Sequence, residues 1–177
     1  MPKPNWTLWF TGLHGSGKST IAERLVKILK GEKIPVTLLD GDELRKTISY
    51  GLGYSLGERN EHMKRVADLC KKITDKGVMA VASVASPTEK SRDYARKTLK
   101  KMLLVYVKCS LGVCAERDVK GHYKKVTEKE KGFEHFMKVS LEFEEPKNPD
   151  IILETDRETV DESVNKLLDK LQEEGIV

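Results

Sequence analysis

The sequence has few cysteines and no long apolar run, and both shortages exclude classes of protein. The three cysteines (Cys70, Cys109 and Cys114) are an odd number without C-x-x-C spacing, so neither a disulfide framework nor a zinc site is expected. No apolar run approaches the roughly 18 residues of a membrane span, and the opening residues 1–5 do not resemble a signal peptide. We therefore expect a cytoplasmic protein with reduced thiols and no membrane partner.

A large excess of one charge sign is also missing. The 32 Lys and Arg residues exceed the 28 Asp and Glu residues by only four, which is too balanced to predict nucleic-acid binding but suits small anionic ligands. Hydrophobic residues make up 38% and charged residues 34% of the chain, which excludes both an integral membrane protein and a disordered chain. The length of 177 residues predicts one domain over residues 1–177.

Apolar runs rich in β-branched residues alternate along the chain with segments of helical period. Strands are expected at residues 7–10, 36–39, 78–84, 103–107 and 151–153. Helices are expected from residue 19, at 58–76, 89–100 and 110–118, and as a C-terminal helix with an apolar stripe from Val160 to Leu171. This alternation is typical of βαβ units and predicts an α/β fold, a three-layer sandwich around a mainly parallel five-stranded sheet.

The segment from about residue 119 to 149 differs from the rest of the chain. It combines many charges with few strand-like residues, and it is interrupted by Gly121, Gly132, Pro146 and Pro149. About thirty residues without a core-facing pattern are usually a functional lid or a disordered insertion. We interpret this segment as a lid with a short helix near residues 133–139.

The strongest motif, GLHGSGKS, occupies residues 12–19 and fits G-x-x-x-x-G-K-[S/T] at every fixed position. Glycines let main-chain N–H groups approach phosphate oxygens, and the helix that follows adds its positive end. Lys18 is expected to reach the β- and γ-phosphates, and the Ser19 hydroxyl is expected to bind Mg²⁺. Because the motif follows an expected strand and opens an expected helix, it predicts a site for ATP or another nucleoside triphosphate with magnesium. The expected nucleotide contacts are Gly12, His14, Gly15, Ser16, Gly17, Lys18, Ser19 and Thr20.

The class of this phosphate-binding loop (P-loop) protein follows from what accompanies the motif. A guanine-reading Asn-Lys-x-Asp is absent, since Asn165-Lys166 precedes two leucines inside an expected helix, and this argues against a GTPase switch. The chain length and the charged lid favour a small kinase that acts on a nucleotide or metabolite. A closed lid excludes water, so that the γ-phosphoryl group reaches an acceptor instead of being hydrolysed.

Candidate acceptor-binding residues follow the second expected strand. Asp42 lies just past that strand, at the carboxyl edge of the sheet, where α/β proteins bind ligands. Its carboxylate either accepts a proton from an acceptor hydroxyl or caps the next helix, while Asp40 is expected to assist Mg²⁺ through water. Arg45 and Arg59 either pair with a phosphate or sulfate on the acceptor or are solvated helix charges.

Several further runs resemble the adenylylsulfate kinase family. LDGDELR (39–45), LGYS (52–55) and ERNE (58–61) are similar to its L-D-G-D-N-x-R, L-G-F-S and D-R-x-E-N. Ala82-Ser83, Ser86-Pro87 and Arg92-Asp93 resemble its A-S-x-x-S-P-x-x-x-x-R-D, and residues 113–149 resemble its lid. The resemblance covers nearly the whole chain in the right order. It implies transfer of the γ-phosphoryl group of ATP to the 3′-hydroxyl of adenosine 5′-phosphosulfate, giving 3′-phosphoadenosine 5′-phosphosulfate.

The resemblance also implies roles for individual residues. Arg117 matches an arginine near the ATP adenine, and Phe133 is expected either to stack the acceptor purine against Tyr54 or to anchor the lid. Ser86 matches a serine that is phosphorylated in some members, but we expect a substrate contact, because in-line transfer needs no covalent intermediate. The acceptor-binding set is Asp42, Arg45, Tyr54, Arg59, His62, Ala85, Ser86, Lys120, Gly132 and Phe133. The catalytic candidates are Lys18, Asp42 and Ser86, and the metal-binding candidates are Ser19 and Asp40.

Departures from the family pattern concentrate on the acceptor side, whereas the ATP side is intact. Thr88-Glu89 replaces Tyr-Arg, His62 replaces an Asn, Tyr54 a Phe and Ala85 an Ile. A divergent adenylylsulfate kinase explains these changes, and so does a related kinase for another nucleotide 3′-hydroxyl, such as a cytidine diphosphoramidate. A non-catalytic ATP-binding regulator is a third interpretation, against which the complete set of Asp42, Arg45 and Arg59 argues. One chain does not fix the oligomeric state, although homodimers are the commonest arrangement of soluble enzymes.

Overall fold

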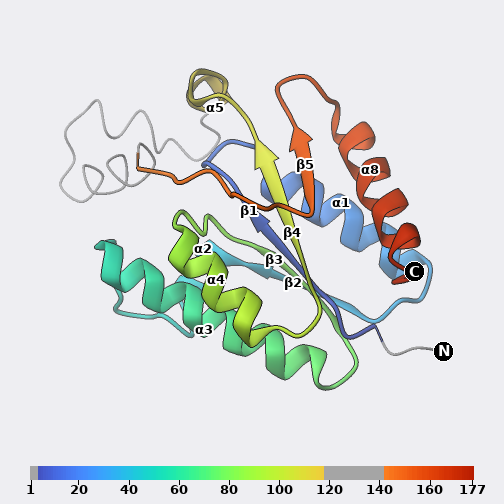
Figure 1. Ribbon diagram of the computed structural model, residues 1–177, viewed down its shortest axis with the longest axis horizontal. Coiled ribbons are helices and arrows are strands. Elements are labelled where there is room, and N and C mark those ends of the chain that lie inside the picture. Colours follow the sequence, from blue (N-terminus) through green and yellow to red (C-terminus); the bar gives the residue numbers. More distant parts are fainter. Residues whose placement is uncertain (1–3, 118–141) are drawn as a thin grey trace.

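The computed structural model describes residues 4–117 and 142–177, in which helices and strands alternate (Figure 1). The predictions for Lys120, Gly132, Phe133 and the short helix at 133–139 lie outside the described residues. In chain order the elements are β1 (Thr7–Thr11), α1 (Lys18–Gly31), β2 (Val36–Asp40), α2 (Gly41–Arg45), α3 (Leu56–Thr74), β3 (Met79–Ser83), α4 (Glu89–Thr98), β4 (Met102–Lys108), α5 (Leu111–Arg117), β5 (Ile151–Glu154) and α8 (Val160–Glu173).

The five strands form one sheet in the order β2-β3-β1-β4-β5, and every neighbouring pair is parallel. The register places Asp40 opposite Ser83 and Ser83 opposite Phe10, so the carboxyl ends of β2, β3 and β1 meet at one edge. Ligands of α/β proteins bind at this edge. The predicted α/β fold with a parallel five-stranded sheet is confirmed.

Helices cover both faces of the sheet (Figure 1). Helices α1 and α8 pack together on one face, and α3 and α4 pack together on the other. Side chains of β1 alternate between these layers: Leu8 and Phe10 pack with α1 and α8, whereas Trp9 packs with α3 and α4. Because both faces of the sheet are covered, the strands β1, β3 and β4 are buried and contain apolar runs instead of a polar–apolar alternation.

The sequence pattern does not predict helix α2, which has five residues and is too short to show a helical period. A local cap sets its start: Oδ1 of Asp40 accepts hydrogen bonds from the N–H groups of Asp42 at 2.9 Å and Glu43 at 3.2 Å. The capping role that was an alternative for Asp42 therefore belongs to Asp40. The cap also fixes the position of the Asp42 backbone just past the carboxyl end of β2.

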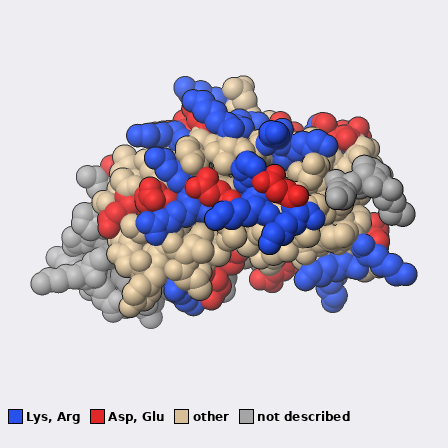
Figure 2. Space-filling model, turned by 90° about the horizontal axis from the view of Figure 1, so that it is seen from below, with Lys and Arg blue, Asp and Glu red and all other residues tan. Residues whose placement is uncertain are grey.

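Charges of both signs are mixed on the surface. Figure 2 shows Lys and Arg side chains lying among Asp and Glu side chains across one face. Exposed pairs such as Lys46–Glu43, 2.7 Å apart, contribute little stability because water screens them. Within residues 4–117 and 142–177, no helix is both long enough and apolar enough to cross a bilayer.

Candidate functional site

A cavity of about 590 Å³ lies at the carboxyl edge of the sheet and brings together most of the residues expected to bind ATP and the acceptor. Residues from the phosphate loop and from helices α2 and α3 share its wall. The predicted site residues that line it are His14, Gly15, Gly17, Lys18, Ser19, Thr20, Asp40, Asp42, Arg45, Tyr54, Arg59, His62, Ala85 and Arg117. Gly12, Ser16 and Ser86 are buried and are not among the residues that line the cavity.

At two points the phosphate loop combines a backbone conformation that favours glycine with no room for a Cβ atom. Gly15 has a φ of +77°, and a Cβ atom there would lie 2.6 Å from the carbonyl oxygen of Cys114. At Gly12 a Cβ atom would lie 2.4 Å from the carbonyl oxygen of Val107. Both obstacles are main-chain atoms of neighbouring elements, so the loop is held against β4 and α5.

Lys18 lies across the inside of this loop. Its Nζ donates hydrogen bonds to the carbonyl oxygens of Gly12 at 2.9 Å and Leu13 at 2.7 Å, and its side chain is 8% exposed. The ammonium group is thus held on the cavity side of helix α1, whose N-terminus begins at the same residue. A buried cation beside a helix N-terminus attracts phosphate oxygens.

Three oxygen-bearing side chains converge beside the loop. The Ser19 hydroxyl lies 3.4 Å from Oδ2 of Asp40 and 3.2 Å from the Ser83 hydroxyl. Because Asp40 uses its other oxygen, Oδ1, to cap α2, its Oδ2 is oriented toward Ser19. Carboxylate and hydroxyl oxygens are the ligands that Mg²⁺ prefers, so this cluster fits a magnesium ion or its bound water.

Thr155 connects the loop to the opposite side of the cavity. Its hydroxyl donates to the carbonyl oxygen of Ser16 at 2.6 Å, and its own carbonyl oxygen accepts from the Arg117 guanidinium at 2.6 Å. Thr155 is buried directly after β5, whereas Arg117 is exposed at the end of α5. The predicted base-contacting residue Arg117 is therefore linked to the phosphate loop through one threonine.

Arg45 and Tyr54 form a pair on the acceptor side. The Arg45 guanidinium lies 4.4 Å from the centre of the Tyr54 ring and donates to the carbonyl oxygen of Gly53 at 3.0 Å. Burial lowers the pKa of Arg45 from its ordinary value, but the group remains a cation at neutral pH. The Tyr54 ring thus provides a flat surface at the cavity wall, and the Arg45 guanidinium provides a positive charge next to it.

Arg59 and His62 come from α3 and face the same cavity. Ser55 and Glu58 form a capping box that fixes the start of this helix, a feature worth about 1 kcal/mol. Arg59 is 6% exposed, and burial together with the charge of Arg45 lowers its pKa to about 10. The positive charges of Arg45 and Arg59 repel each other, and a bound anion relieves this repulsion.

Ser86 occupies a strained turn behind the cavity wall. Its φ is +41°, its hydroxyl lies 3.0 Å from the hydroxyl of Ser91, and the residue is fully buried. The Ser86 carbonyl oxygen accepts from Thr11 at 3.0 Å and from Arg92 at 2.7 Å. The neighbours of Ser86 reach the cavity instead: Ala85 and Pro87 line it.

Sequence reasoning missed several cavity residues. Ser83 and Thr155 stand at the ends of β3 and β5, so the rule that singled out Asp40 at the end of β2 was a signal that could have found them. Gly41 and Pro87 lie inside runs that resemble the family motifs, which was a second available signal. No local motif marks the others, because tertiary packing alone brings them to the site. The remaining missed residues are Ile21, Gly41, Met63, Val84, Pro87, Glu158, Thr159 and Val160.

The fold and the loop define a P-loop nucleotide-binding protein of the α/β class. A family model described as adenylylsulphate kinase matches residues 4–154. Proteins named adenylyl-sulfate kinase from Gloeothece citriformis and Clostridium kluyveri are 40% and 42% identical, over 96% and 93% of this chain and 95% and 82% of the relatives. The chain therefore belongs to the adenylylsulfate kinase family.

A solved structure agrees with this assignment. The Mycobacterium tuberculosis APS kinase CysC, in complex with AMPPNP and APS, is 31% identical and has a TM-score of 0.82. The match covers 94% of this chain and 96% of that chain. The family resemblance expected from the sequence motifs is thus confirmed over nearly the whole length.

Proposed function

We propose that the protein is an ATP-dependent kinase that phosphorylates the 3′-hydroxyl of adenosine 5′-phosphosulfate. The observation that carries this proposal is that the phosphate loop and the set Asp42, Arg45 and Arg59 line one cavity. A phosphoryl donor and an anionic acceptor can therefore be held in contact. Family membership supports the choice of acceptor.

On the donor side, the loop N–H groups and Lys18 hold the β- and γ-phosphates, and Arg117 lies against the adenine. Main-chain amides and the lysine stabilise the charge that spreads over the transferring group. Ser19 and Asp40 are the residues that would hold magnesium, with Ser83 next to them. A bound magnesium ion would supply further positive charge to the phosphate oxygens.

On the acceptor side, Arg45 and Arg59 bind the phosphosulfate group and Tyr54 stacks on the purine. Asp42 accepts the proton of the 3′-hydroxyl as that oxygen forms a bond to the γ-phosphorus. The bond from the γ-phosphorus to the bridging oxygen breaks, and ADP leaves. We extend the acceptor site to Lys120, Gly132 and Phe133 on the basis of the family pattern.

Direct transfer gives Ser86 no covalent role. Its hydroxyl is buried against Ser91, which supports a role for this residue in shaping the turn that carries Ala85 and Pro87. His62 contributes to the same wall from α3.

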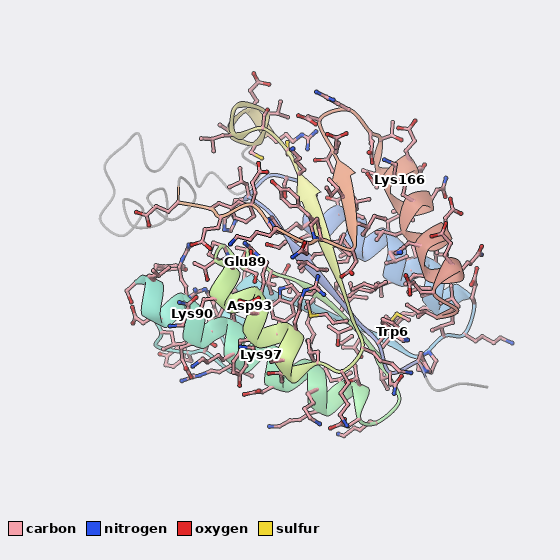
Figure 3. All side chains as sticks on the ribbon, viewed as in Figure 1. Trp6, Glu89, Lys90, Asp93, Lys97 and Lys166 are labelled. Carbon is pink, nitrogen blue, oxygen red and sulfur yellow. The ribbon has the colours of Figure 1, made fainter. Side chains whose placement is uncertain are left out.

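The departure at Thr88-Glu89 does not argue for a different acceptor. Thr88 caps α4 and donates to the side-chain oxygen of Asn60 at 2.9 Å. Glu89 lies in the first turn of the helix that also carries Lys90, Asp93 and Lys97 (Figure 3), and it pairs with Arg92 at 2.7 Å. The Glu89 carboxylate is thus engaged outside the cavity lining.

The test is a product assay with purified protein, ATP and a panel of acceptors. We expect formation of 3′-phosphoadenosine 5′-phosphosulfate and ADP in equal amounts with adenosine 5′-phosphosulfate, and far slower turnover with adenosine 5′-phosphate or cytidine diphosphoramidates. Turnover that is fastest with a cytidine nucleotide would refute the choice of acceptor. ATP binding without turnover of any acceptor would favour a regulator.

We also propose a cytoplasmic location and a homodimeric state. All three cysteines are free and buried, which suits a reducing compartment. Light scattering of the purified protein measures the oligomeric state directly.

A further inference from the structure

His62 joins the two ends of one short segment to helix α3. Its ring is 2% exposed, with Nδ1 lying 2.7 Å from the hydroxyl of Ser49 and Nε2 lying 3.0 Å from the carbonyl oxygen of Gly41. Gly41 is the first residue of α2, and Ser49 lies in the turn that follows α2. One imidazole therefore spans the segment 41–49 from its start to its end.

The hydrogen-bond partners fix the form of the ring. The Gly41 carbonyl oxygen can only accept, so Nε2 must carry a hydrogen. In the neutral ring Nδ1 is then an acceptor, and the Ser49 hydroxyl donates to it. Burial and the charge of Arg45 lower the pKa of His62 to about 4, so the ring is neutral at physiological pH. Both ring nitrogens are used inside the protein.

The segment that His62 spans carries two residues of the acceptor side, Asp42 and Arg45. The start of the segment is held by the Asp40 cap and by the bond from His62 to Gly41. Near its end, Arg65 on α3 donates to the carbonyl oxygen of Ile48 at 2.8 Å, next to the bond from Ser49 to His62. Helix α3 thus holds both ends of the segment, and the start is held one residue before Asp42.

We propose that His62 is a positioning residue for the reaction: its Nε2–H···O bond to Gly41 sets the place of Asp42 and Arg45 against the acceptor, and its ring nitrogens do not bind the substrate. The proposal rests on the proposed function only for the identity of the acceptor. Catalytic groups displaced by about 1 Å lose rates of about 100-fold, so a bond next to Asp42 controls kcat more than it controls ATP binding.

Two neutral amide variants separate the two ring nitrogens. The amide nitrogen of His62→Gln reaches the place of Nε2 and can still donate to Gly41, whereas the shorter amide of His62→Asn reaches only the place of Nδ1. We expect kcat with adenosine 5′-phosphosulfate to fall about 10- to 100-fold in His62→Asn and at most about threefold in His62→Gln. The dissociation constant for ATP should change less than twofold in both.

A second readout does not depend on the acceptor. Hydrogen–deuterium exchange of the amides in residues 41–49 should become faster in His62→Asn and remain near the wild-type rate in His62→Gln. Unchanged exchange and unchanged kcat in His62→Asn would overturn the proposal. An equal rise of KM for the acceptor in both variants, without a change in exchange, would instead make His62 a substrate ligand and would also overturn it. A wild-type protein that does not use adenosine 5′-phosphosulfate refutes the proposed function, and the exchange rates still decide the role of His62.

Discussion

Replacing Gly15 by alanine should damage the protein far more than one added methyl group suggests. The residue has a φ of +77°, and a non-glycine residue in this region costs about 1–2 kcal/mol. The new Cβ atom would lie 2.6 Å from the Cys114 carbonyl oxygen, a main-chain atom that moves only if α5 moves. Such overpacking costs about a further 1–3 kcal/mol. We therefore expect Gly15→Ala to lower the free energy of unfolding by about 2–5 kcal/mol.

The matched control is Gly31→Ala at the end of α1, where an added Cβ atom would meet nothing within 4 Å. This change should raise stability by up to about 1 kcal/mol, because alanine is the better helix former. Urea unfolding followed by circular dichroism measures both effects, and calorimetry measures ATP binding. Gly15→Ala should weaken ATP binding at least about tenfold, whereas Gly31→Ala should leave it unchanged. If Gly15→Ala binds ATP normally and stays within about 0.5 kcal/mol of the wild type, the geometry derived for the loop is wrong.

Three further substitutions test other parts of the site. Asp42→Asn should lower kcat by about 10²–10⁴-fold with little change in the dissociation constant for ATP, and near-normal turnover would exclude Asp42 as the base. Thr155→Val removes the 2.6 Å hydrogen bond to the carbonyl oxygen of Ser16, which should lower the free energy of unfolding by about 1–3 kcal/mol and weaken ATP binding. Thr155→Ser keeps the hydroxyl and should keep both stability and ATP binding near the wild-type values. Equal effects of the two variants would contradict this role of the hydroxyl. The pKa of His62 is lowered by burial and by the charge of Arg45 to about 4, below its ordinary 6.5, so the unfolded chain takes up the proton first. The stability linked to this ring is therefore full above pH 6.5 and is lost as the pH falls through 4, by on the order of 3 kcal/mol; His62→Gln should lack this part of the acid destabilisation in urea titrations, and an identical pH profile would contradict it.

The sequence was most informative where function depends on local backbone geometry. Residues 12–19 form the predicted phosphate loop, because the spacing of glycine and lysine in one short run is enough to identify this turn, although Val107, Cys114 and Thr155 also contact it. The five strands were also predictable: β1, β3 and β4 are buried on both faces and form apolar runs, and the shorter apolar runs of β2 and β5 are partly exposed. Their ends differ from expectation by at most one residue, as at β4, which extends to Lys108.

Long-range contacts were not readable from the sequence. Thr155 lies 139 residues from Ser16 along the chain, and only the order of strands in the sheet brings its hydroxyl to the phosphate loop. The hydrogen bonds of His62 depend on how α3 packs against α2, and the apolar periodicity of the sequence does not indicate this packing. Likewise, a family motif can indicate that Ser86 belongs near the site, but not that its φ is +41° and that its hydroxyl faces Ser91.

The proposed mechanism requires that ATP and the acceptor bind in one cavity and react directly. The stereochemical course of the phosphoryl transfer is the most direct test of this requirement. ATP made chiral at the γ-phosphorus with oxygen isotopes would be reacted with adenosine 5′-phosphosulfate, and the configuration of the new 3′-phosphate would be determined. A single in-line transfer between the two bound nucleotides gives inversion at phosphorus and no phosphorylated protein on the reaction path. Retention of configuration, or a Ser86 phosphate that passes to the acceptor, would show that the two nucleotides do not react directly.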